Sequence, residues 1–573
     1  MKEKSARVPL RGFDRQSLIL LPWSLLLSAA VVLGGRLHIE DNYAGTIAEN
    51  YFLPFRRADL LLFLAVFLTA QLAAGFLTGL SERRGRECRT EEAYRGAAKG
   101  KAFLLLWPAL FLAWLPYFLK FSPGFIPTDA VISLQEALGL APMTNRQPMI
   151  FALLLRFLVF VTGGFRTKDV TAACMIFSLC QMAFLSGSAA YLMAWLKRRF
   201  RLKPLLVGCL AAIYGLSPYL AQSSITMWKD PAFSGLLVLW TLRLADFCLD
   251  PELIEKRSWR LGFLLIGLLT CFWRSNGITT GLMTALLAAC LCLRGGRDRR
   301  ARLKKLLVCA CVVCLIWFAV VGPVCKLAGI GGIPPEESAG VMLNQMARVA
   351  AEGGRMSEED RAFLNALLPI EYYPEEYRPC SVDLLKWSER FYSEPLYSSQ
   401  FYRTWVSLLL KNPRSYLEAW LMGNYGFWTV NRPEINLATS FGDTYNLVKT
   451  GTMEIGGYIV RFEPLADTDN AFFRHVGSDA WSLPLGLLNW LLFALALALI
   501  RRREAALLLA LAPTLGLALG VLISTPIWYL PRYELAVQLL APFYLLLLLR
   551  GSALRGKETG TADAGERRVG KND

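Results

Sequence analysis

Long apolar runs separated by short polar segments dominate the chain from residue 17 to residue 550. Runs of this kind are typical of membrane-spanning helices, because a span needs about 20 consecutive apolar residues to cross the hydrocarbon core. The pattern predicts an all-α polytopic membrane protein with about 12 transmembrane helices. We expect the spans at residues 17–35, 59–80, 102–120, 171–196, 204–221, 233–249, 260–273, 277–293, 306–325, 482–500, 505–523 and 534–550.

Basic residues between these runs set the predicted orientation. The chain carries a formal charge of +17, but its Lys and Arg residues cluster in the short loops 81–101, 197–203 and 294–305. This placement follows the positive-inside rule, so we expect those loops in the cytoplasm and exclude a nucleic-acid partner. If the apolar segment 149–165 crossed the membrane, loop 197–203 would lie outside. We therefore predict that 149–165 is a re-entrant or interfacial helix on the outer face, and that both termini are cytoplasmic.

One large polar region interrupts the apolar pattern. Residues 327–480 hold 20 acids against 13 Lys plus Arg, the reverse of the whole chain, as suits an extracytoplasmic domain of mixed structure. Within it, Ser357 to Asp360 is typical of a capped helix start. The aromatic-rich stretch 401–428 is expected along the membrane interface. The predicted organisation is a transmembrane bundle, this outer domain, the last transmembrane helices and a disordered cytoplasmic tail, at 1–326, 327–480, 481–550 and 551–573.

The polar stretch 121–148, FSPGFIPTDAVISLQEALGLAPMTNRQP, is the candidate catalytic loop, because it places Asp129 between membrane segments. On the predicted topology Asp129, Lys229-Asp230, Arg274 and Arg532 all lie at helix ends on the outer face. Each acid is also a candidate helix cap, and each arginine a candidate headgroup or interface anchor. Their shared location favours a site where cations bind a lipid-linked phosphate and a carboxylate activates a hydroxyl.

Several short sequence segments resemble those of a known protein family. TDAVISLQEALG, NRQP, SITMWKDPAF, WRSNG, PEESAGVMLNQMARV, NYGFW and LPRYE occur in this order over roughly residues 100–550. They resemble an uncharacterised bacterial multispan membrane family thought to share the GT-C fold. That fold belongs to glycosyltransferases that use polyprenyl-phosphate sugars, such as protein O-mannosyltransferases and lipid A aminoarabinose transferases. At the position of the segment NRQP, members of that family usually have Asn-His-His-Pro, whereas this chain has Asn145-Arg146-Gln147-Pro148.

The resemblance implies an inverting glycosyltransferase of the bacterial cell membrane that acts on the outer face. Asp129 is the implied general base and Asp230 the second acid. The donor is implied to be a polyprenyl-phosphate sugar, and the acceptor an envelope glycan, lipid or protein. The candidate substrate-binding residues are Lys229, Arg274, Asn276, Arg532, Tyr533, Gln135, Asn145 and Gln147.

Two questions stay open at the level of the sequence. The chain has only two histidines, which excludes a His-built metal centre, but a divalent cation held by Asp129 and Asp230 remains an alternative. A transporter or flippase of a lipid-linked sugar would use the same charges to line a pathway. A non-catalytic envelope assembly protein would use 327–480 to bind a partner, because a fold does not fix a function.

Overall fold

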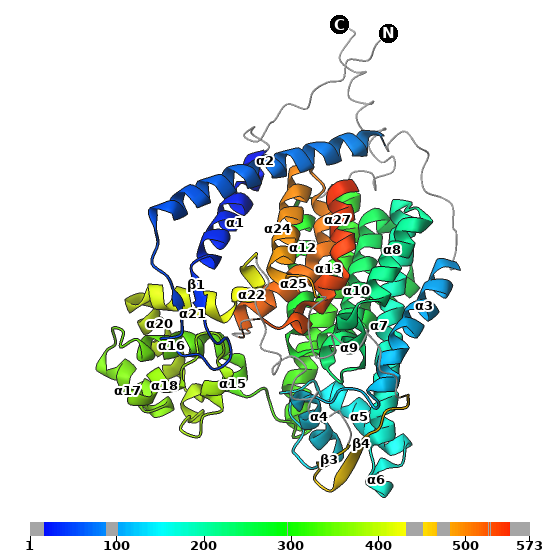
Figure 1. Ribbon diagram of the computed structural model, residues 1–573. Helices are drawn as coiled ribbons and strands as arrows, with labels where there is room; N and C mark the ends of the chain where they lie inside the picture. The colour runs from blue at the N-terminus through cyan, green and yellow to red at the C-terminus, as the bar shows by residue number, and fades with distance from the viewer. Residues whose placement is uncertain are drawn as a thin grey trace.

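The computed structural model describes residues 17–87, 101–294, 296–430, 451–466, 482–524, 527 and 529–550. Helices make up most of this part of the chain, and most of them run side by side in one bundle (Figure 1). Among the described residues, seven helices are long and apolar enough to cross a membrane, or up to nine if two bent pairs each count as one span. The predicted tail 551–573 lies outside the described residues.

The bundle helices coincide with the predicted apolar runs, because each run is long enough to satisfy its own backbone hydrogen bonds as a helix. They are α1 (Leu21–Gly34), α2 (Arg57–Glu87), α3 (Lys101–Lys120), α7 (Thr171–Phe200), α8 (Pro204–Gly215), α9 (Pro218–Ile225), α10 (Lys229–Leu249), α11 (Arg257–Trp273), α12 (Ile278–Arg294), α13 (Arg297–Ala319), α14 (Cys325–Leu327), α24 (Leu485–Arg501), α25 (Leu508–Ser524), α26 (Leu535–Leu539) and α27 (Ala541–Arg550). Short helical turns join them at η1 (Ser17–Leu20), η3 (Pro251–Glu255), η4 (Ser275–Gly277), η5 (Val320–Val324), η10 (Ala505–Leu507) and η11 (Pro531–Glu534).

Two of the predicted spans are broken helices. The chain bends by 59° between α8 and α9, and by 43° between α26 and α27. At the first bend Ser217 accepts a hydrogen bond from the Leu220 N–H and so caps α9, which begins at Pro218. Helices α11 and α24 have 17 residues each, which is fewer than the about 20 residues that a membrane span needs. The predicted number of spans therefore exceeds what length and composition support in the described chain.

The predicted outer domain has a hydrophobic core of its own. Its core also contacts Ile47, which comes from the first loop of the chain between strands β1 (Leu37–Ile39) and β2 (Asn50–Phe52). The domain lies beside one end of the bundle, next to the β1–β2 hairpin (Figure 1). Its helices are α15 (Pro335–Ser338), α16 (Gly340–Ala351), α17 (Glu358–Leu367), α18 (Tyr373–Glu376), α19 (Asp383–Lys386), α20 (Ser399–Lys411), α21 (Pro413–Gly423) and α22 (Tyr425–Trp428), with turns η6 (Ile370–Tyr372) and η7 (Glu394–Tyr397).

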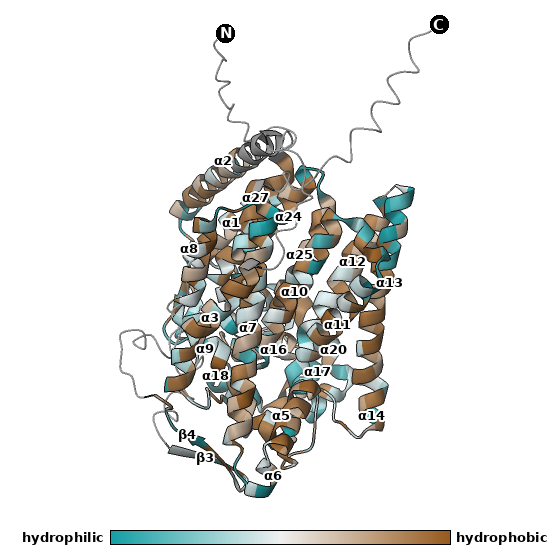
Figure 2. Cartoon of the chain, turned by 90° about the vertical axis from the view of Figure 1, so that its right-hand side faces the viewer, coloured by the Kyte–Doolittle hydropathy of each residue, from teal (hydrophilic) through white to brown (hydrophobic). Residues whose placement is uncertain are grey.

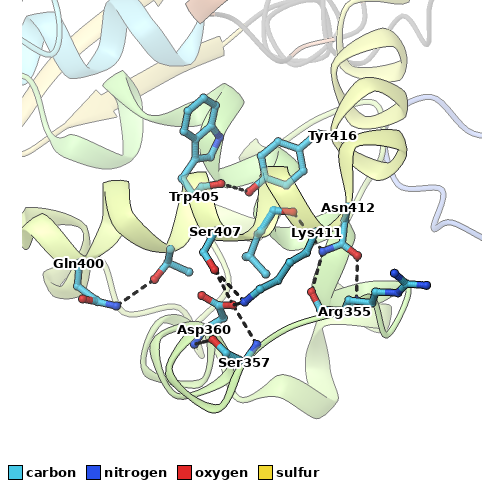
Figure 3. Close-up of polar contacts among 11 residues, drawn as sticks. Arg355, Ser357, Asp360, Gln400, Trp405, Ser407, Lys411, Asn412 and Tyr416 are labelled. Carbon is cyan, nitrogen blue, oxygen red and sulfur yellow. Dashed lines mark hydrogen bonds and ion pairs between the residues drawn. The ribbon is translucent and has the colours of Figure 1, made fainter.

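The predicted cap at Ser357 is confirmed. The Ser357 hydroxyl accepts from the Asp360 N–H, and the Asp360 carboxylate accepts from the Ser357 N–H, which is a complete capping box. Figure 3 shows the same carboxylate also bound by Lys411 and Ser407 of α20, at 2.6 and 3.0 Å. One buried acid therefore caps α17 and joins it to α20.

Helix α5 (Met149–Val161) is the predicted re-entrant segment. It has 13 residues, so it is about 20 Å long and shorter than the hydrocarbon core of a bilayer. Beyond α5 and the short α6, the Val170 N–H donates to the Ile459 carbonyl at 2.9 Å. Ile459 belongs to strand β4 (Tyr458–Phe462), which forms a hairpin with β3 (Gly451–Ile455). Helices α4 (Thr128–Leu138), α5 and α6 (Gly164–Thr167) lie with this hairpin at one end of the bundle (Figure 1). This arrangement fits a helix that does not cross.

Candidate functional site

A backbone contact places Asp129 next to Lys229. The Phe125 N–H donates to the Ile225 carbonyl at 3.1 Å, and the Met227 N–H donates to the Phe125 carbonyl at 2.8 Å. Gly124 makes this contact possible, since it has a φ of +114° and a Cβ there would lie 2.4 Å from the Ile225 carbonyl oxygen. The loop before α4 and the loop before α10 are thus held side by side.

Asp129 forms the accessible part of the site. Its carboxylate lies 3.1 Å from an Arg532 guanidinium nitrogen, with side chains 32% and 16% exposed for Asp129 and Arg532. The second carboxylate oxygen accepts from the Gln147 amide at 3.3 Å. The Gln147 carbonyl oxygen in turn accepts from the Lys229 ammonium group. Four of the predicted site residues therefore form one connected network that is partly open to the surface.

Asp230 and Arg274 form a second pair that is buried. An Asp230 oxygen lies 3.3 Å from an Arg274 nitrogen, and their side chains are only 1% and 6% exposed. The same Arg274 nitrogen donates to the Tyr533 carbonyl at 3.0 Å. The alternative of Arg274 as an anchor to lipid headgroups is therefore wrong, because its guanidinium lies inside the protein.

Aromatic rings lie next to both guanidinium groups, and the Tyr533 ring is common to the two. Arg532 lies 4.4 Å from the Trp228 ring centroid and 5.2 Å from that of Tyr533. Arg274 lies 4.7 Å from the Tyr533 ring and 5.5 Å from the Phe233 ring. Cations are attracted to the faces of aromatic rings, so these rings hold the Arg532 and Arg274 charges near each other in fixed positions.

Neither acid acts as the helix cap that the sequence left open. Asp129 is the second residue of α4 and Asp230 the second of α10, and neither helix has a side-chain cap hydrogen bond in the described structure. Both carboxylate oxygens of Asp230 lack a hydrogen bond among the described residues. A buried carboxylate paired mainly by charge is costly, so its place beside Arg274 calls for a functional or positioning role.

The remaining predicted residues differ in their placement. Asn145 is buried, lacks a partner for its side-chain nitrogen among the described residues, and lines a small pocket together with Arg274. Asn276 instead donates to the Ser524 hydroxyl at 2.9 Å and joins η4 to α25. Gln135 is half-buried near the end of α4, where its carbonyl accepts from the Leu140 N–H. The Asn276 side chain therefore holds the scaffold, whereas the Gln135 bond comes from its backbone and assigns its side chain no role.

The sequence reasoning missed several residues that build the site. Glu136 accepts from the Thr144 hydroxyl at 2.7 Å and so fixes the loop that carries Gln147. Arg146 pairs with Glu337 of the outer domain at 3.2 Å. Trp228 and Phe233 were also missed, although the sequence indicates both. Trp228 adjoins Lys229 in the chain, and Phe233 follows Asp230 at a spacing that places the two on one helix face. The pairing of Arg146 with Glu337 has no local signal.

The charges around Asp129 determine its protonation. Burial raises the pKa of this carboxyl, but the nearby Lys229 and Arg532 cations outweigh burial and lower the pKa from 3.8 to about 2. The pKa of Glu136 moves the other way, since burial raises it more than the Thr144 hydrogen bonds lower it. Asp129 is thus ionised at neutral pH and is a weak base while Arg532 remains bound to it.

The described residues give no support for a resident metal. No group of three His, Cys, Asp or Glu side chains in the described ranges is arranged to hold an ion. Asp129 and Asp230 each face an arginine rather than each other. A divalent cation would have to displace those guanidinium groups, so the geometry favours an anion over a cation at this site.

The fold and site together define a multi-pass α-helical membrane protein with a charged cluster at one end of its bundle. The chain matches the family of unknown function DUF6020 over residues 140–562 and belongs to that family. The matched range includes Lys229, Asp230, Arg274 and Arg532 but begins after Asp129. No curated protein and no solved structure matches the chain.

Proposed function

We propose that the protein is a membrane glycosyltransferase that moves a sugar from a polyprenyl-phosphate donor to an envelope acceptor. The observation that carries the proposal is the network of Asp129, Arg532, Gln147 and Lys229, which is partly accessible and combines a carboxylate with two cations. Such a combination suits a reaction in which a hydroxyl loses a proton while a phosphate leaves as an anion.

The donor phosphate would bind Arg532 and Lys229. Arg532 offers a planar fork that matches two phosphate oxygens, and Lys229 adds a point charge nearby. Arg274 is buried next to Tyr533, so its charge would stabilise the phosphate through the protein interior rather than by contact. Asp230 would then be a positioning residue that holds Arg274 in place, in contrast to its predicted role as a second catalytic acid.

Donor binding would also activate Asp129. A phosphate on Arg532 competes with the Asp129 carboxylate for the same guanidinium nitrogens, so the ion pair at 3.1 Å would open. The pKa of Asp129 would then rise from about 2 towards its ordinary value of 3.8, which makes the carboxylate a better proton acceptor. In this way the base becomes available only when the donor is in place.

The transfer is a single displacement. The acceptor hydroxyl gives its proton to an Asp129 oxygen as its own oxygen forms a bond to the anomeric carbon. The bond from that carbon to the phosphate oxygen breaks, and its electron pair leaves with the polyprenyl phosphate. One carboxylate suffices for this route, which inverts the configuration because no glycosyl-enzyme intermediate forms.

The same proposal includes the membrane arrangement. About 12 spans in a bacterial cell membrane, with both termini cytoplasmic, would place the site and the outer domain on the outer face. The short helix α5 and the basic composition of loops 197–203 and 294–305 support this orientation. Arg146, paired with Glu337, would connect the catalytic loop to the domain that presents the acceptor.

The test is complementation of a deletion strain, scored by the sugar content of its envelope at matched protein level. Asp129→Asn keeps an oxygen for Arg532 but cannot take a proton at neutral pH, so transfer should fall by about two orders of magnitude or more. Full restoration of the sugar by Asp129→Asn would contradict the role of Asp129 as a base. An unchanged envelope after deletion of the gene would favour an assembly role, and lipid-linked sugar trapped on the inner face would favour a flippase.

A further inference from the structure

The outward face of α5 carries an apolar groove with one cation. Leu153, Phe157 and Phe160 of α5 line it together with Phe165 of α6, and Arg156 lies among them. The groove is open to the surface and has a volume of about 490 Å³. Figure 2 shows α5 in brown beside α6 at the lower end of the bundle.

Arg156 has no acidic partner among the described residues. Its guanidinium donates to the Ala137 carbonyl at 3.4 Å and lies 5.8 Å from the Phe165 ring centroid. Neither contact neutralises its charge. A cation with apolar walls and no carboxylate needs an anion from elsewhere, because an unpaired charge is costly next to hydrocarbon.

Helix α5 is apolar on both of its faces. Phe151, Leu155 and Val159 are buried against the bundle, whereas Phe157 and Phe160 are 59% and 73% exposed on the other side. A helix that exposes phenylalanines to this extent has hydrocarbon on its outer side. An anion at Arg156 would therefore be attached to an apolar chain.

We propose that this groove binds an anionic phospholipid, with its phosphate on Arg156 and its acyl chains against Phe157 and Phe160. A guanidinium matches phosphate oxygens in a bidentate fashion, and Arg156 is the one cation among the residues that line this groove. This lipid is not the reacting donor. Arg156 contacts the Ala137 carbonyl of α4, eight residues and about 12 Å along that helix from Asp129, so its phosphate is remote from Asp129.

Native mass spectrometry of the purified full chain, with phosphatidylglycerol or phosphatidylcholine added, tests the proposal. The parent should retain phosphatidylglycerol at least about tenfold better than phosphatidylcholine, since only the former carries net charge. Arg156→Gln should lose this preference. Arg166→Gln is the matched control, because it removes an equal charge from the adjacent α6, and it should keep most of the preference.

Each of the following results would overturn the assignment. Equal retention of the two lipids would show that the groove has no selectivity for an anion. Equal losses in Arg156→Gln and Arg166→Gln would show an unspecific charge effect. Displacement of phosphatidylglycerol by stoichiometric polyprenyl phosphate would make the groove a donor site instead. If Arg156→Gln does not fold, Arg156→Lys keeps the charge without the fork and should reduce the preference about threefold. No reduction in that variant would also contradict the proposal.

Discussion

At the scale of single residues, the site consists of two Asp–Arg pairs that differ in access. Asp129 and Arg532 are partly open, whereas Asp230 and Arg274 are buried, and both guanidinium groups lie near the Tyr533 ring. Under the proposed function, this difference favours contact with substrate for the first pair and positioning for the second. A phosphate bound to Arg532 would then have to open the ion pair of Asp129.

The pKa of Asp129 predicts how stability depends on pH. The folded-state pKa of about 2 lies below the ordinary value of 3.8, so the ionised carboxylate stabilises the fold at pH values above about 4. That contribution is lost as pH falls from about 4 towards 2. The difference in melting temperature between the parent and Asp129→Asn should therefore be constant from pH 5 to 8 and should shrink below about pH 4.

The same pair of proteins carrying Arg532→Gln provides the control, because that substitution removes one of the three cations, Lys229, Arg532 and Arg146, that lower the pKa of Asp129. The stability difference caused by Asp129→Asn should be smaller in this background. A difference that titrates near pH 6 instead would show that Asp129 has a raised pKa and would contradict the ion pair.

Arg532 should matter for donor binding through its shape as well as its charge. Arg532→Lys keeps the charge but loses the fork and the stacking on Trp228, so the affinity for a polyprenyl-phosphate sugar should fall about tenfold. Arg532→Ala should lower it about 100-fold. The measurement is donor binding to purified protein.

Arg390 offers a matched control in the outer domain. It also pairs with an acid, Glu376 at 3.0 Å, and lies over an aromatic ring, that of Tyr372 at 4.2 Å. Arg390→Ala should leave donor binding unchanged. Tight donor binding by Arg532→Ala would show that the phosphate binds elsewhere.

At the scale of elements, hydropathy predicted the helices because a span satisfies its backbone within one local segment. The break before α9 also had a local signal, Ser217-Pro218, which caps and starts a helix. The pairing of each acid with a particular arginine had none. Asp129 and Arg532 are far apart in the chain, and their contact depends on how α4, α10 and η11 pack. The positive-inside rule predicted only that they share a face.

The loop that carries Asp129 should depend on Gly124. An alanine there would place its Cβ 2.4 Å from the Ile225 carbonyl oxygen, at a φ of +114° that side chains rarely adopt. Gly124→Ala should destabilise the fold by about 2 kcal/mol or more and abolish transfer, because Asp129 and Lys229 would separate. Melting temperature and sugar transfer measure the two effects.

Gly139 is the matched control, since it also has a positive φ, +76°, but no atom within 4 Å of an added Cβ. Gly139→Ala should cost only about 1 kcal/mol and should retain transfer. Equal effects of the two substitutions would show that backbone conformation, rather than the contact with Ile225, determines the outcome.

At the scale of the whole molecule, the outer domain and the bundle meet at the candidate site. The Asn145 N–H donates to the Gly331 carbonyl at 2.9 Å, and Arg146 pairs with Glu337, so the candidate loop 121–148 contacts both parts. The outer domain also takes Ile47 from the first loop of the chain. Composition predicts a separate region from residue 327 onward, but it gave no sign that Ile47 packs against the core of that region.

The orientation of the molecule depends on α5, and accessibility labelling decides it. Single cysteines are placed in a cysteine-free background at four exposed positions: Thr128, Thr167, Ser338 and Gly296. If α5 does not cross the membrane, Thr128 and Thr167 lie on the same side, although α5 separates them in the chain. Cysteines at Thr128, Thr167 and Ser338 should therefore react with an impermeant maleimide from outside the cell. Gly296→Cys, in the basic loop before α13, should react only after the membrane is opened.

External labelling at Thr128 together with protection at Thr167 would mean that α5 crosses. The orientation of every later helix would then be reversed, and Asp129 and Arg532 would be assigned to opposite faces, which their ion pair at 3.1 Å forbids.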